Sequence, residues 1–128
     1  MMIYLDTSAA LGQLLTESHR PPAWIWEQTL FSSRLLEYET FITLGSRGLL
    51  KSHGEGARIL LERVSLVELT PDVLARALEP FPIPLRTLDA LHLATAEFLR
   101  GRGHELKVMT FDQRLGHAAK AVGFSLAT

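Results

Sequence analysis

Short apolar runs alternate along the chain with segments that favour helices. Residues 2–5 are all apolar, a pattern typical of a parallel strand that is buried on both faces. Similar runs predict further strands at residues 30–32, 64–69 and 106–110, and a weak fifth strand at residues 123–126. Because helices are predicted between these runs, we expect an α/β fold in which helices cover both faces of a small parallel sheet.

Capping residues set the limits of the predicted helices. Asp6, Thr7 and Ser8 favour helix N-caps and open a helix that runs to about residue 17. Thr70 is a similar cap, and Pro71 follows it at the first helical position. Other helices are predicted at residues 34–49 with Ser33 as the cap, and at residues 55–62, 87–99 and 112–121.

Glycine and proline mark the breaks between these helices. Gly48 and residues 51–54 fit the termination of the helix before them, and residues 81–84 hold two prolines and must form a loop. Pro22 fits an early position of a second, short helix. Trp24 and Trp26 in that segment are core or lid aromatics, with a partner-binding surface as the alternative.

Length and composition indicate one ordinary globular domain, residues 1–128. Hydrophobic residues make up 47% of the chain and charged residues 21%, which suits a packed core, and no apolar run is long enough for a membrane span. The chain has no cysteine, which excludes disulfides and thiolate metal sites and favours the cytoplasm. A net charge of −1 gives no global sign of nucleic-acid binding, so such a function has to come from a local site.

Three aspartates fall at one edge of the predicted sheet. Asp6 and Asp112 follow the first and fourth strands, and Asp89 lies in the first turn of the helix after the proline loop. Each has an ordinary structural explanation as a helix cap or a favourable charge at a helix start. Ligands bind at the carboxyl ends of strands in open α/β sheets, and like charges gathered there would repel one another unless a cation held them.

The ligand chemistry of such a cluster points to a hard cation. Carboxylate oxygens select Mg²⁺ or Mn²⁺ rather than Zn²⁺, and these ions suit phosphodiester hydrolysis. His92 lies three residues beyond Asp89 on the same predicted helix, within reach of the site. A histidine in that position is more often a structural residue than a ligand, and the sequence leaves both roles open.

The acids occur in four segments: IYLDTSA at residues 3–9, SSRLL at 32–36 with Glu39 following, LRTLDALHLA at 85–94, and TFD at 110–112. In this order, over nearly the whole chain, the segments resemble the PIN-domain ribonucleases, and most closely the VapC toxins of toxin–antitoxin pairs. The resemblance implies a PIN-like three-layer fold with sheet order 3-2-1-4-5, bound Mg²⁺ or Mn²⁺, and endonucleolytic cleavage of RNA. It also implies inhibition by an antitoxin and a homodimer.

The same resemblance assigns roles to individual residues. The metal-binding and catalytic acids of the family fall on Asp6, Glu39, Asp89 and Asp112. Thr7 and Thr110 match family positions that help to orient ligands or water, and Arg86 and Arg114, close to two of the acids, are candidate RNA contacts.

Two glutamates compete for the fourth ligand position. Glu37 and Tyr38 precede Glu39 where many relatives carry a basic or polar residue, which leaves the choice of glutamate open. At about 100° per residue, Glu39 falls roughly 60° and Glu37 roughly 140° from the centre of the apolar face, which we expect to be buried. We therefore assign the ligand role to Glu39 and a surface role to Glu37. The apolar face consists of Leu35, Tyr38, Ile42, Leu49 and Leu50.

Other functions fit the sequence less well. A strand that ends in an aspartate also begins the haloacid-dehalogenase phosphatases, but their D-x-D pattern needs an acid at the position of Ser8. A PIN protein that binds RNA or a partner without cutting would normally lack one of the acids, and all four are present. Between a toxin and an RNA-processing nuclease, the short chain favours the toxin.

Overall fold

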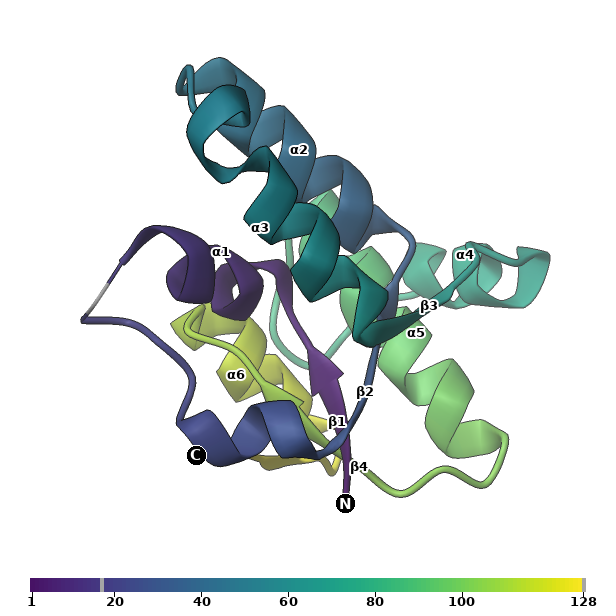
Figure 1. The fold of residues 1–128 in the computed structure, drawn as a ribbon. Helices are drawn as coiled ribbons and strands as arrows, with labels where there is room; N and C mark the ends of the chain where they lie inside the picture. The colour runs from purple at the N-terminus through teal and green to yellow at the C-terminus, as the bar shows by residue number, and fades with distance from the viewer. Residues whose placement is uncertain (17, 128) are drawn as a thin grey trace.

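The computed structural model describes residues 1–16 and 18–127, and its strands form one parallel sheet (Figure 1). The sheet order is β3-β2-β1-β4-β5, so the central strand is the apolar run that opens the chain. This confirms the predicted α/β class and strand order. The strands are β1 (Met2–Leu5), β2 (Thr29–Ser33), β3 (Val64–Val67), β4 (Leu106–Met109) and β5 (Ser125–Leu126).

Helices connect the strands and form the outer layers (Figure 1). They are α1 (Thr7–Leu15), the 3-10 helix η1 (Ala23–Glu27), α2 (Leu35–Ser46), α3 (Leu50–Glu62), α4 (Pro71–Leu78), α5 (Thr87–Gly101) and α6 (Gln113–Ala121). Asp6, Thr70 and Asp112 cap α1, α4 and α6 with their side chains, as predicted. The predicted end of the first helix, at residue 17, lies outside the described residues. None of the helices within those residues is both long and apolar enough to cross a membrane.

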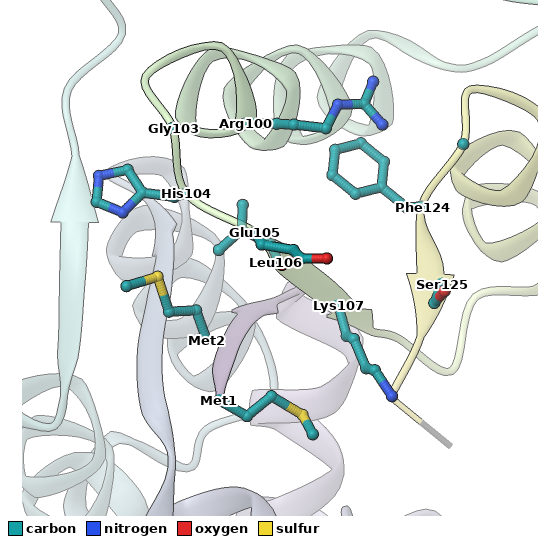
Figure 2. A pocket seen from close by; sticks show the side chains of 11 residues that line it. Met1, Met2, Arg100, Gly103, His104, Glu105, Leu106, Lys107, Phe124 and Ser125 are labelled. Carbon is teal, nitrogen blue, oxygen red and sulfur yellow. The ribbon is translucent and has the colours of Figure 1, made fainter.

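The two ends of the sheet differ in character. A cavity of about 510 Å³ lies at the amino ends of β1, β4 and β5 (Figure 2). In this cavity the guanidinium of Arg100 lies 4.0 Å from the centre of the Phe124 ring and donates a hydrogen bond to the carbonyl of Val122 (2.9 Å). These contacts stabilise the fold and occupy the guanidinium. Glu105 is the one carboxylate that lines this cavity within the described residues. The acids singled out by the sequence lie instead near the carboxyl ends of the strands.

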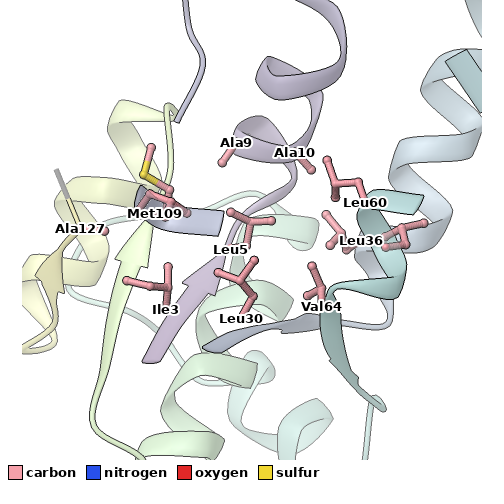
Figure 3. Packing of buried hydrophobic residues seen from close by; sticks show 12 residues of the cluster. Ile3, Leu5, Ala9, Ala10, Leu30, Leu36, Leu60, Val64, Met109 and Ala127 are labelled. Atoms are coloured by element: carbon pink, nitrogen blue, oxygen red, sulfur yellow. The ribbon is translucent and has the colours of Figure 1, made fainter. Parts of the chain in front are cut away.

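Side chains that alternate along β1 divide the core into two clusters. Ile3 and Leu5 pack with α1, α2 and α3 on one face, where Figure 3 shows them in one cluster with Ala9 and Leu36. Tyr4 points to the other face and packs with residues of α5 and α6. The site at the end of β1 is therefore held between helices from both layers.

Two predicted limits around α2 are wrong. Arg34, not Ser33, is the N-cap residue, although Ser33 Oγ still accepts a hydrogen bond from the N–H of Leu35 (3.1 Å). The helix ends at Ser46 rather than at residue 49, because Gly48 takes a left-handed conformation (φ 69°) that turns the chain.

The next helix begins earlier than predicted. Residues 51–54, expected to terminate the preceding helix, lie inside α3, which starts at Leu50. Gly54 and Gly56 lower the helix propensity of this segment, but packing outweighs propensity here. The residues of α3 that are buried in the core are Ala57, Leu60 and Leu61.

The prediction of which face of α2 is buried is also wrong. The buried residues are Leu36, Thr40 and Leu44, whereas Tyr38 is 57% exposed and Ile42 is 67% exposed. These buried positions recur every four residues, so they form a single ridge of the helix. Tyr38 and Ile42, which belong to the apolar face predicted to be buried, therefore lie on the surface.

Candidate active site

Asp6 serves both the fold and the site. Its Oδ2 accepts hydrogen bonds from Ser8 Oγ (2.7 Å) and Thr110 Oγ1 (2.8 Å), and a longer one from the N–H of Ser8 (3.4 Å). The residue is 4% exposed, and its Oδ1 lies 3.9 Å from Nε2 of His92. One carboxylate oxygen is thus fixed by the start of α1 and the end of β4, and the other is directed towards α5.

Ser8 and Thr110 join the start of α1 to the loop after β4. Thr110 Oγ1 accepts a hydrogen bond from the N–H of Asp112 (3.0 Å) while it donates to Asp6. Ser8 Oγ accepts one from the N–H of Phe111 (2.9 Å). These bonds bring two predicted acids together across more than 100 residues of sequence. The sequence marked Ser8 only as a capping residue, and no local pattern predicts its cross-link to residue 111.

Glu39 reaches the same site from α2. Its Oε1 accepts hydrogen bonds from Nε2 of His92 (2.6 Å) and from the hydroxyl of Thr7 (3.0 Å). The carboxylate can only accept, so Nε2 of His92 is the donor. On the far side of the ring, Nδ1 of His92 lies 2.7 Å from the hydroxyl of Tyr4. Tyr4, His92 and Thr7 together hold the Glu39 carboxylate in one orientation.

The sequence missed Tyr4 and did not decide the role of His92. Both side chains are about 1% exposed, so the pair is part of the core as well as of the site. A signal for Tyr4 existed, because it stands two residues before Asp6 and alternate strand residues share a face. The contact between Tyr4 and His92 joins β1 to α5 and is visible only in the structure.

The acids affect one another electrostatically. Burial raises the pKa of Asp89 above its ordinary value, and the negative charges of Asp112, Asp6 and Glu39 raise it further. Burial lowers the pKa of His92, but the hydrogen bond to Glu39 and the charges of Asp6 and Glu39 outweigh burial and raise it. The four acids therefore share one region of mutual repulsion, which a cation would relieve.

The donor set suits a hard divalent cation. Every predicted ligand is a carboxylate, and Mg²⁺ binds through a few carboxylates while it keeps several waters. Within residues 1–16 and 18–127, no three Asp, Glu or His side chains stand close enough to enclose a metal ion by themselves. An ion with water in its coordination shell fits such widely set acids better than a fully protein-bound one.

The remaining candidates lie at the surface around these acids. Arg86 is the N-cap residue of α5, Arg114 lies in the first turn of α6, and both are exposed. Glu37 forms an ion pair with Arg34 (3.5 Å) and its side chain is 43% exposed. The structure therefore places Glu39 with the other acids and Glu37 on the outside of α2. The apolar face from which this assignment was predicted is nevertheless not the buried face of the helix.

Comparison with protein families identifies this arrangement. The PIN domain matches residues 3–121, a range that includes all four acids. The chain belongs to the PIN-domain family.

Full-length relatives narrow the family further. The chain is 33% identical to Ribonuclease VapC47 of Mycobacterium tuberculosis, over 99% of this chain and 96% of the relative. It is 34% identical to Ribonuclease VapC46 of the same species, over 97% and 95% of the two chains. A solved chain titled "Toxin-antitoxin complex from Klebsiella pneumoniae" shares the fold, with a TM-score of 0.63, 15% identity and 93% coverage of each chain. The homologues of this PIN domain are thus VapC ribonucleases.

Proposed function

We propose that this PIN-domain chain is a Mg²⁺- or Mn²⁺-dependent endoribonuclease that acts as the toxin of a toxin–antitoxin pair. The observation that carries the proposal is the convergence of Asp6, Glu39, Asp89 and Asp112 at the carboxyl ends of the strands. Full-length similarity to VapC ribonucleases supports RNA as the substrate. The match to a chain of a toxin–antitoxin complex supports a fold that such a toxin can have.

The residues of the chain would divide the work of phosphodiester hydrolysis among them. Asp6, Glu39, Asp89 and Asp112 would hold a divalent cation, which supplies charge neutralisation at the phosphate and lowers the pKa of a bound water. Ser8 and Thr110 orient Asp6, and Thr7 with His92 orients Glu39. This support is needed because a misplaced carboxylate would lose its place in the coordination shell.

Metal dependence is the first test. Purified protein freed of metal with EDTA is expected to leave a single-stranded RNA intact, and added Mg²⁺ or Mn²⁺ should restore cleavage, because the acids alone repel a polyanion. Gel analysis of labelled RNA gives the readout, with Ca²⁺ as a second cation for comparison. Undiminished cleavage after exhaustive chelation would remove the proposed mechanism.

Tyr4 is expected to act as a positioning residue for Glu39 through His92. Tyr4→Phe removes only the hydroxyl that contacts Nδ1 of His92, so we expect about tenfold weaker Mn²⁺ binding and slower turnover in an otherwise intact fold. Calorimetry measures the Mn²⁺ affinity, and single-turnover assays measure the cleavage step. Tyr38→Phe, the same change on the exposed surface of α2, is the matched control. Equal Mn²⁺ affinity in both variants would show that Tyr4 only packs in the core and does not position Glu39.

The proposed partners are an RNA substrate, a cognate antitoxin and a second copy of the chain in a homodimer, all in the cytoplasm. Of the two tryptophans considered as a partner-binding surface, Trp24 is 39% exposed, whereas Trp26 is half-buried against the core, as is Phe81 in the proline loop. Other exposed apolar side chains include Tyr38 and Ile42 on α2 and Leu74 and Leu78 on α4. Protein contacts on these helices would remove that apolar surface from water.

Expression experiments test the toxin role. The chain produced alone should arrest growth, and co-production with the small protein of an adjacent gene should restore growth and yield an inactive complex. The Asp89→Asn variant, produced alone at the same level, is the control and should be harmless. Harmless high expression of enzyme that cleaves RNA in vitro would contradict the toxin assignment while leaving the nuclease intact.

A further inference from the structure

A groove runs from the acidic site along one side of α6. It has a volume of about 360 Å³ and includes two residues of the site, Thr110 and Asp112. Thr110 is bonded to Asp6, and Asp112 begins α6, so the groove opens directly beside the carboxylates. The other residues that line it are His19, Phe111, Gln113, Gly116, His117, Lys120 and Leu126.

One wall of the groove is a ridge of α6. Gln113, His117 and Lys120 stand at intervals of four and three residues, so they share one face of the helix, and all three are exposed. The helix rises about 12 Å between Asp112 and Lys120. This wall therefore leads from the acidic site to Lys120, over a distance that an extended single-stranded nucleic acid would cover with about two nucleotides.

Between these side chains the groove is lined by a glycine. A Cβ at Gly116 would lie 3.5 Å from Leu126 Cδ1 and 3.7 Å from Thr110 Cγ2, which are ordinary contact distances. The fold itself does not need a glycine at this position, because an alanine would fit without a clash. The absence of a side chain instead leaves the groove deeper next to the site.

Two aromatic side chains also line the groove. His19 packs edge-on against Phe111 with ring centroids 5.7 Å apart and planes at 74°. Gly12 allows this arrangement, since a Cβ there would collide with the carbonyl oxygen of His19 and come within 3.3 Å of Phe111. The segment that carries His19 is thus held against α1, and an aromatic pair lines the groove together with the ridge of α6.

We propose that this α6 groove, the cavity defined by the nine residues above, binds the RNA strand next to the phosphate that is cut. The inference rests on the proposed nuclease function and names the path of its substrate. Lys120, His117 and His19 supply cationic or hydrogen-bonding groups for phosphates, and the His19–Phe111 pair offers a surface for a base. Single-stranded RNA combines both chemistries, with a charged backbone and flat unpaired bases, whereas an acidic peptide would use only the basic wall.

The test measures RNA binding in protein that cannot cut. With Asp89→Asn as the background, Lys120→Ala and His117→Ala should each weaken binding of a short fluorescein-labelled single-stranded RNA several-fold in anisotropy titrations. Lys120→Ala should also make the negative slope of log affinity against log salt shallower by about 0.7, as expected for one lost phosphate contact. Lys51→Ala, which removes an exposed lysine at the distant start of α3, is the matched control (Figure 1).

Gly116→Ala separates a binding role from a structural one. Alanine should raise the melting temperature, because it favours the helix and meets no clash, while it weakens RNA binding by narrowing the groove. RNA binding equal to the background protein in all three groove variants would overturn the proposal. Loss of antitoxin binding with RNA binding unchanged would also overturn it, since the groove would then be a protein-docking surface. Groove-dependent RNA binding without cleavage by the wild-type protein in Mg²⁺ or Mn²⁺ would overturn only the proposed nuclease function.

Discussion

Replacing Asp6 by asparagine is expected to abolish RNA cleavage and leave the fold intact. Asparagine keeps an oxygen that can accept the hydrogen bonds of Ser8 and Thr110, and it remains a good N-cap for α1. It removes the negative charge that the proposed metal requires. We expect cleavage to fall at least 100-fold, a loss at the upper end of that seen for groups that merely orient a metal ligand.

Thermal unfolding distinguishes this explanation from a loss of structure. Without metal, Asp6→Asn should unfold at the wild-type temperature or slightly above it, because one of four mutually repelling carboxylates is gone. Added Mn²⁺ should raise the melting temperature of the wild-type protein but not that of the variant, since a ligand stabilises only the state that binds it. A variant that still cut RNA at the wild-type rate would show that Asp6 is only a helix cap.

The fold was predictable from sequence where local chemistry determines it. Apolar runs placed the strands, and Asp6, Thr70 and Asp112 marked helix starts that the structure confirms. The start of α3 was missed because Gly54 lies in a helix that packing, rather than propensity, stabilises. Local patterns fail when contacts with the rest of the chain decide the outcome.

The error on α2 has the same origin. The helix offers two stripes, and the more hydrophobic one, with Tyr38 and Ile42, stays on the surface, while a ridge that includes Thr40 is buried. Hydrophobicity alone cannot predict this arrangement, because it depends on where β1 and α1 place their side chains. For the site, the sequence located the acids, but not the groups that orient them: the Tyr4–His92 contact spans 88 residues and the Thr110–Asp6 contact 104.

Glutamine at position 39 should remove both metal binding and cleavage, whereas glutamine at position 37 should preserve most of each. Glu39 is held by His92 and Thr7 beside the other acids, with a side chain 21% exposed. Glutamine keeps the acceptor oxygen for these two donors, so the fold should survive, but it lacks the charge that a divalent cation needs. We expect Mn²⁺ affinity to fall at least tenfold and cleavage at least 100-fold in Glu39→Gln.

Glu37→Gln is the matched control, because it makes the same chemical change two residues away on the same helix. Its ion pair with Arg34 is exposed to solvent and contributes little to stability. Calorimetric titration with Mn²⁺ and single-turnover cleavage of one RNA give the two readouts for both variants. If Glu37→Gln lost both activities and Glu39→Gln kept them, the ion would bind on the outer side of α2. The hydrogen bonds from His92 and Thr7 to Glu39 would then be purely structural, a buried polar link between α2, α1 and α5.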